Sequence, residues 1–102
     1  MDTAATLAQL SEAASLMTDA KLARRRSLCE QSQPLIEGLS LAIATKFDND
    51  AYLREKLSQL NSGLKSLAGL TKDGNYPPGQ NYQDVLSAIM NLTEGMVDGR
   101  SV

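Results

Sequence analysis

The spacing of leucine residues in the middle of the chain constrains its fold more than any other feature. Five leucines follow one another at intervals of four and three residues: Leu53, Leu57, Leu60, Leu64 and Leu67. This period matches one face of an α-helix and excludes a β-strand, whose side chains alternate with a period of two. The stripe therefore predicts a helix, for which the carboxylate and amide side chains of residues 48–50 are N-cap candidates.

A second stripe with the same spacing follows a segment rich in proline and glycine. Residues 71–81 contain Asp-Gly and Pro-Pro-Gly, which are strong turn signals, so we predict a loop there. The stripe beyond this loop predicts a helix from about Tyr82 to Val97 that packs antiparallel to the leucine helix. Its members are Tyr82, Val85, Ile89, Leu92 and Met96, and Leu86, Met90 and Val97 widen it on one flank.

The first half of the chain is less regular. Apolar spacing predicts a helix from about Thr3 to Met17. Residues 18–33 are rich in helix formers but lack a continuous stripe, so one long helix and two shorter ones are both open. We expect Pro34 to begin a new helix that extends to Phe47, because its missing N–H costs nothing in a first turn. The alternative is a kink within a longer helix.

These segments define an all-α protein. The chain has 102 residues, the size of one domain, and its four aromatic residues include no tryptophan, so the core must be largely aliphatic. We predict a small three- or four-helix bundle over residues 1–102, with an antiparallel helical hairpin and a frayed tail at residues 99–102. A long continuous N-terminal helix would favour completion of the core by dimerisation.

Residue types that the chain lacks exclude several classes of function. It contains no histidine and a single cysteine, Cys29, so we expect neither a metal nor another cofactor. A net charge of -2 does not favour nucleic acid as a partner, and no apolar run approaches the ~20 residues of a membrane span. The N-terminus does not resemble a signal peptide, so we expect a cytoplasmic protein.

An aromatic and proline-rich segment is the first candidate for contact with a partner. Tyr76, Pro77, Pro78 and Tyr82 combine two tyrosines with a diproline, which gives a stiff apolar surface that can also form hydrogen bonds. The alternative is a rigid connector whose tyrosines cover the end of the bundle.

A run of three arginines is the second candidate. Arg24, Arg25 and Arg26 could contact an acidic partner, or they could form a solvated helix face with Glu30 one turn away. Cys29 lies beside this run. Without a histidine as its base, Cys29 is more simply interpreted as a small buried side chain than as a nucleophile.

The sequence therefore predicts a non-enzymatic helical module that binds another protein through apolar helix faces, by helix-in-groove or coiled-coil contacts. It resembles, in size and helix layout, small bacterial secretion or flagellar export chaperones and phage-encoded adaptors or inhibitors. The first alternative is a structural subunit that assembles with itself, and we expect a homo-oligomer such as a dimer. A small thiol enzyme that uses Cys29 is the second alternative.

Overall fold

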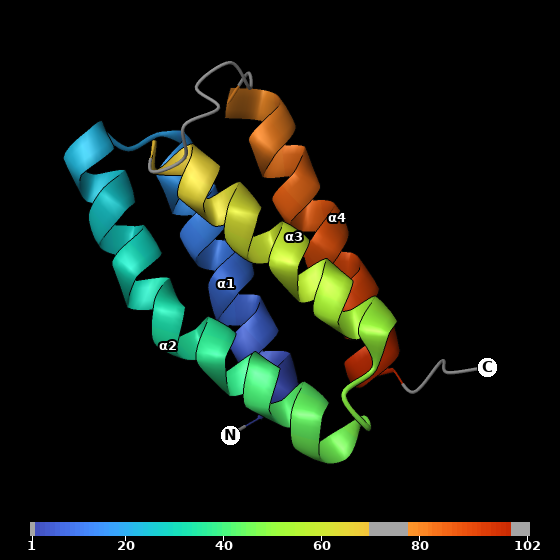
Figure 1. Cartoon of the computed structure of the whole chain (residues 1–102). Helices are drawn as coiled ribbons and strands as arrows, with labels where there is room; N and C mark the ends of the chain where they lie inside the picture. Colours follow the sequence, from blue (N-terminus) through green and yellow to red (C-terminus); the bar gives the residue numbers. More distant parts are fainter. Residues whose placement is uncertain (1, 70–77, 99–102) are drawn as a thin grey trace.

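Four helices make up the part of the chain that this computed structural model describes, which is residues 2–69 and 78–98 (Figure 1). Side chains of the last helix are described from Tyr82 onward. The helices are α1 (Thr3–Thr18), α2 (Leu22–Lys46), α3 (Ala51–Leu67) and α4 (Pro78–Met96).

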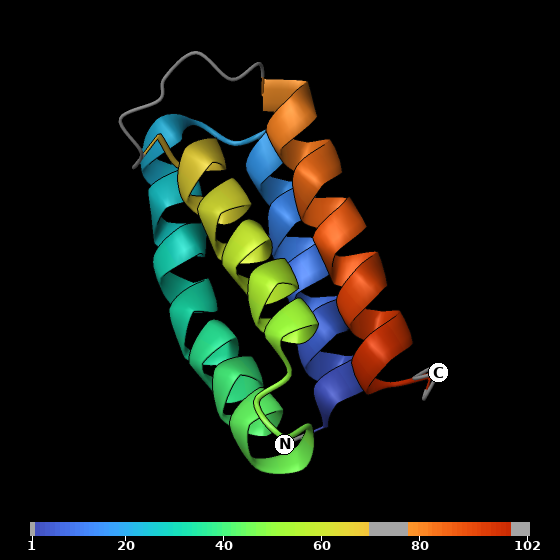
Figure 2. The ribbon, with the colours of Figure 1, turned by 45° about the vertical axis from the view of Figure 1, so that its right-hand side comes forward.

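Successive helices run in opposite directions and form an up-and-down bundle (Figures 1 and 2). α1 packs against α2 and α4, and α3 packs against the same two helices from the opposite corner. α1 also touches α3 across the bundle, whereas the described residues of α2 and α4 are not in contact. The prediction of an all-α bundle with an antiparallel hairpin, α3 followed by α4, is confirmed. The start of α1 and the end of α4 lie at the same end of the molecule.

The predicted stripes form the core. All five leucines of the α3 stripe are buried, and Leu60 and Leu64 have no exposed surface. The predicted core-facing residues of α4 are buried from Val85 to Met96, and Tyr82 packs against the core at its edge. Gly95 lies where α4 packs closely against α3, because a Cβ atom there would stand 2.7 Å from Leu53 Cδ2. The hairpin is thus held together by aliphatic packing.

α1 and α2 are separate helices, which answers one question left open by the sequence. The Asp2 carboxylate caps α1 by accepting a hydrogen bond from the Ala4 amide at 3.1 Å. α1 ends at Thr18, and after a short turn α2 begins at Leu22. Because the first helix is short, no shared-core dimer is required to bury a long N-terminal helix.

The expectation that Pro34 begins a new helix is wrong, since α2 continues through it. Pro34 has no backbone N–H, so the Glu30 carbonyl one turn earlier loses its helical hydrogen-bond donor. Pro34 and Glu30 are both exposed, so the missing bond lies on the side of the helix that faces water. In the same turns the Ser32 hydroxyl donates to the Leu28 carbonyl at 2.8 Å, and Gln33 Nε2 donates to the Cys29 carbonyl at 3.5 Å. These bonds support the backbone where the proline interrupts it.

The acidic and amide residues between α2 and α3 have two different structural roles. Asp50 is the N-cap of α3, and its carboxylate accepts from the Leu53 amide at 3.1 Å. Asp48 and Asn49 take left-handed conformations, with φ of 52° and 56°, which Asp and Asn tolerate better than most residues. The turn therefore needs these residue types in addition to the cap.

α4 begins one turn earlier than expected. The predicted loop 71–81 is wrong at its end, because residues 78–81 already belong to the helix. Pro78 is the first helical residue, a position at which the fixed φ of proline is favourable. The rest of that loop, residues 71–77, and the predicted tail, residues 99–102, lie outside the described residues.

Candidate functional site

The aromatic and proline-rich candidate is only partly described. Tyr76 and Pro77 lie outside the described residues, and of Pro78 only its backbone place at the start of α4 is given. Tyr82 is half-buried and packs against the core. This position fits the alternative in which the tyrosine covers the end of the bundle.

The three arginines occupy the first turns of α2 and have different surroundings. Arg25 Nη1 donates a hydrogen bond of 2.9 Å to the carbonyl oxygen of Leu67, the last residue of α3. The same guanidinium buries its Nε without a hydrogen-bond partner. Arg24 and Arg26 are exposed. Arg25 therefore caps the negative end of α3, and the other two arginines remain on the surface.

Further polar contacts join α2 to α3. Gln33 Nε2 donates to Asn61 Oδ1 at 3.1 Å, and Arg54 Nη1 donates to Ser40 Oγ at 2.7 Å. Arg54 also bonds to Asn49 in the turn between the two helices. These side chains connect the two helices, and their hydrogen bonds are made within the protein.

Cys29 lies on α2 and is buried, as expected for a small side chain that packs in the core. Burial raises the pKa of the Cys29 thiol above its ordinary value of 9.0, with a smaller contribution in the same direction from Glu30. Lys65 and the hydrogen bond from Gln33 oppose this shift. A buried thiol with a raised pKa is a weak nucleophile at neutral pH.

Neither a metal centre nor a membrane span is present in the described part of the chain. Within the described residues there is no group of three or more His, Cys, Asp or Glu side chains that could hold a metal ion. No helix in that same part of the chain combines the length and apolar character needed to cross a membrane.

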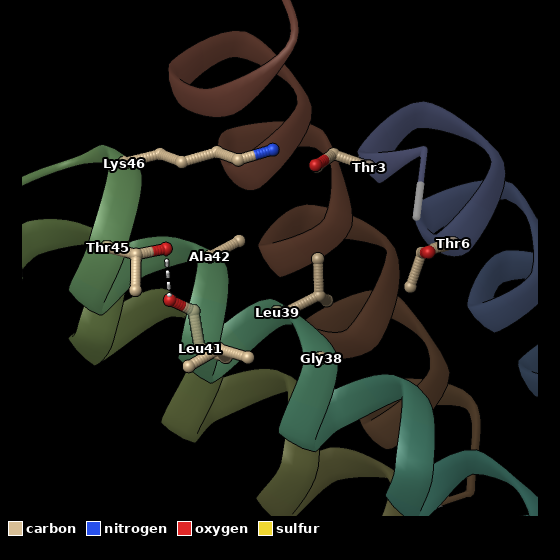
Figure 3. A pocket seen from close by; sticks show the side chains of 8 residues that line it. All are labelled: Thr3, Thr6, Gly38, Leu39, Leu41, Ala42, Thr45 and Lys46. Atoms are coloured by element: carbon tan, nitrogen blue, oxygen red, sulfur yellow. Dashed lines mark hydrogen bonds between the residues drawn. The ribbon is translucent and has the colours of Figure 1, made fainter.

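A surface pocket lies between the start of α1 and the end of α2, and we call it the Lys46 pocket (Figure 3). Its volume is about 180 Å³, and the Lys46 amine extends across its mouth toward Thr3. The Thr45 hydroxyl donates to the Leu41 carbonyl at 2.9 Å, and the Thr6 hydroxyl donates to the Asp2 carbonyl. The lining residues are Thr3, Thr6, Gly38, Leu39, Leu41, Ala42, Thr45 and Lys46.

A second pocket, which we call the Glu12 pocket, lies further along the same two helices. Its volume is about 240 Å³. Ser32, which lines this pocket, is buried, and its hydroxyl donates to the Leu28 carbonyl of the same helix. Its hydroxyl proton therefore needs no acceptor from a ligand. The lining residues are Gln9, Glu12, Ala13, Leu16, Leu28, Gln31, Ser32 and Leu35.

Together the two pockets define the α1/α2 groove. From the residues that line them, their centres are about 12–15 Å apart along the helix axes, at a rise of ~1.5 Å per residue. Exposed leucines stand at the two pockets, Leu41 with 65% and Leu16 with 50% of its surface accessible. Only Glu12 and Lys46 among the lining residues are charged. Depletion of charge around accessible apolar side chains is typical of the centre of a protein interface.

This groove was not predicted from the sequence. The α2 side of it is a second stripe with the spacing of a helix face, formed by Leu28, Gln31, Leu35, Gly38, Ala42 and Thr45. Half of these residues are polar or glycine, so the stripe is inconspicuous in a search for apolar residues. The small side chains at Gly38 and Ala42 are what leave space for a pocket.

Charges are divided between two sides of the bundle. Residues 2–20 and 78–98 contain only acidic charges, three in each segment. Residues 21–68 contain eight basic and five acidic side chains. Since α1 packs against α4 and α2 packs against α3, one side of the bundle is acidic and the other has a basic excess. The α1/α2 groove lies on the boundary between these sides.

Comparison of the chain with protein-family models, with curated proteins and with solved structures found no match in any of the three.

Proposed function

We propose that the protein is a non-enzymatic binding module that holds an amphipathic helix of a protein partner in the α1/α2 groove. The observation that supports this most strongly is the pair of aligned pockets. Their separation of about 12–15 Å corresponds to eight to ten residues of a helix, so one helix can place an apolar side chain in each. Anchors two turns apart on one face are typical of helix-in-groove recognition.

The composition of the groove also supports a protein ligand. The pockets are shallow and mainly apolar, and their hydroxyl groups at Thr6, Ser32 and Thr45 donate to backbone carbonyls. The buried thiol of Cys29 is not among the lining residues of either pocket. We therefore prefer a binding function to the thiol-enzyme alternative. A single cysteine, where a small secreted domain usually carries several, also supports the cytoplasm as the compartment.

Capture of partners with matched variants tests the proposal. The double variant Leu16→Glu with Leu41→Glu places a charge at each pocket, and both positions are exposed, so the fold should persist. Tyr52→Glu is the control, because Tyr52 is similarly exposed on α3, away from the groove. Each immobilised protein is incubated with extract of its host, and the retained complexes are weighed intact.

We expect the native protein and the Tyr52 variant to retain the same stoichiometric partner, and the double variant to lose it by at least about tenfold. Equal retention by the double variant, with its helicity unchanged by circular dichroism, would contradict a role for the groove. The experiment also compares the predicted candidates: loss on replacing Arg24 and Arg26 alone would assign binding to the arginine run.

A further inference from the structure

A second apolar stripe lies on the outside of α4, and nothing in the described residues covers it. Leu86, Met90, Thr93 and Val97 follow one another with the spacing of a helix face. Met90 and Val97 have 58% and 39% of their surface exposed, and Leu86 is half-buried. The Thr93 hydroxyl donates to the Ile89 carbonyl at 2.7 Å, so it does not interrupt the stripe with an unpaired donor. We call these four residues the α4 stripe.

We propose that the helix bound in the α1/α2 groove is α4 of a second copy of this chain, held by its α4 stripe. This inference rests on the proposed function, because it names the partner of the same groove. It makes the protein a subunit that assembles with itself through two different surfaces.

The dimensions of the stripe and the groove agree. From the midpoint of Leu86 and Met90 to Val97 is nine residues, or about 13 Å of helix, within the separation of the two pockets. The longer pair of side chains would occupy the larger pocket, of about 240 Å³, and Val97 would occupy the smaller one, of about 180 Å³. The Val97 amide still donates to the Thr93 carbonyl at 2.9 Å, so the stripe stays helical to its last member.

The charges agree in the same alignment. Glu94 is exposed one turn before Val97, which brings its carboxylate to the end of the groove that carries the Lys46 amine. Residues 85–93 are uncharged, so no second carboxylate of the stripe faces Glu12 in the other pocket. With the stripe reversed, Glu94 would lie closer to Glu12 instead. Exposed pairs of this kind contribute little affinity but fix the orientation of a complex.

This alignment determines the symmetry of the assembly. The groove end with Lys46 is the C-terminal end of α2, and Val97 follows the C-terminal end of α4, so α4 of one copy runs parallel to α2 of the next. Within one copy α2 and α4 also run in the same direction (Figure 1). All copies therefore point the same way. Such a contact joins unlike surfaces, and it closes into a ring or extends as a filament.

Complementation between two defective variants tests the proposal. Met90→Glu disables the stripe and leaves the groove intact, whereas Leu16→Glu with Leu41→Glu disables the groove and leaves the stripe intact. Sedimentation velocity of the full chain should show multiples of 11.0 kDa that grow with concentration, and either variant alone should be monomeric. An equimolar mixture should form a heterodimer and nothing larger, because it contains one working groove and one working stripe.

A pair of charge reversals supplies a second measurement that does not depend on placing a charge in an apolar contact. Lys46→Glu or Glu94→Lys should each weaken assembly by about 3- to 10-fold, and the two reversals combined in one chain should restore it. Tyr52→Glu should leave assembly unchanged.

Several results would overturn the inference. One is a native chain that stays monomeric up to ~1 mM. Another is a Met90 variant that still dimerises, which would indicate a contact between like surfaces, and a third is a mixture that fails to associate. If the native chain is monomeric while the groove variant still loses a captured partner of different mass, the proposed function holds and only its assignment to a second copy fails.

Discussion

At the scale of single residues, Arg25 shows how a charged side chain that suggests binding can instead complete the fold. The first turns of α2 carry three arginines and no acidic residue, an unfavourable arrangement at the positive end of a helix. The carbonyl of Leu67 accepts a hydrogen bond from Arg25 and gives one of these charges a structural partner. The sequence could predict the run of charge, but not which member faces the end of α3, because that depends on how two helices meet.

The different surroundings of neighbouring arginines predict different effects of truncation. Arg25→Ala should lower the free energy of unfolding by about 1–2 kcal/mol, because it removes a hydrogen bond from a charged donor. Arg24→Ala is the matched control and should change it by less than ~0.5 kcal/mol, since its side chain is exposed. Urea unfolding followed by circular dichroism measures both, and equal losses would contradict the capping role.

The raised pKa of Cys29 predicts a loss of stability in alkali. Above pH 9.0, the ordinary pKa of the thiol, the unfolded chain loses the thiol proton before the folded chain does. The contribution of Cys29 to stability is therefore complete below this pH and falls as the pH rises toward the raised value. Urea unfolding from pH 7 to 10.5, under reducing conditions, should show the stability advantage of the native chain over Cys29→Ala narrowing above pH 9. An advantage that is constant over this range would contradict the shift.

At the scale of elements, the helices with the most regular spacing of apolar residues were the easiest to predict from the sequence. α3 was predicted with its cap because its leucines recur without a break and Asp50 stands directly before them. Residue types alone could not predict that α2 continues through Pro34. The free-energy cost of a proline inside a helix depends on whether the carbonyl that loses its hydrogen bond faces water or the core. The groove was missed for a similar reason, because a pocket arises from the small residues of two helices that are distant in sequence.

The buried stripe of α3 should dominate stability. Leu60→Ala should cost about 2–5 kcal/mol, since its side chain is fully buried and the neighbouring helices cannot fill the space completely. Leu41→Ala is the matched control, because this leucine is the most exposed of the large apolar residues described, and its loss should cost less than ~0.5 kcal/mol. Chemical denaturation distinguishes them. A cost below ~0.5 kcal/mol for Leu60 would place that face of α3 on the surface.

At the scale of the whole molecule, the net charge of -2 conceals two sides of opposite sign. The acidic helices α1 and α4 are neighbours, and so are α2 and α3 with their basic excess. The groove on the boundary has Lys46 from the second side and Glu12 from the first, so a helix held there as proposed would be given a direction as well as a site. A bundle of uniformly mixed charge would bind an apolar stripe in either orientation.

The start of α1 and the end of α4 lie at one end of the bundle (Figure 2). In an assembly whose copies all point the same way, every such pair emerges on the same side. The row would be a sheet or ring with two different faces: one would carry the start of α1, the end of α4 and the turn between α2 and α3, and the other would carry the turn between α1 and α2 (Figures 1 and 2). Cargo fused to either end would then be displayed on a single face, at the lateral spacing of one bundle.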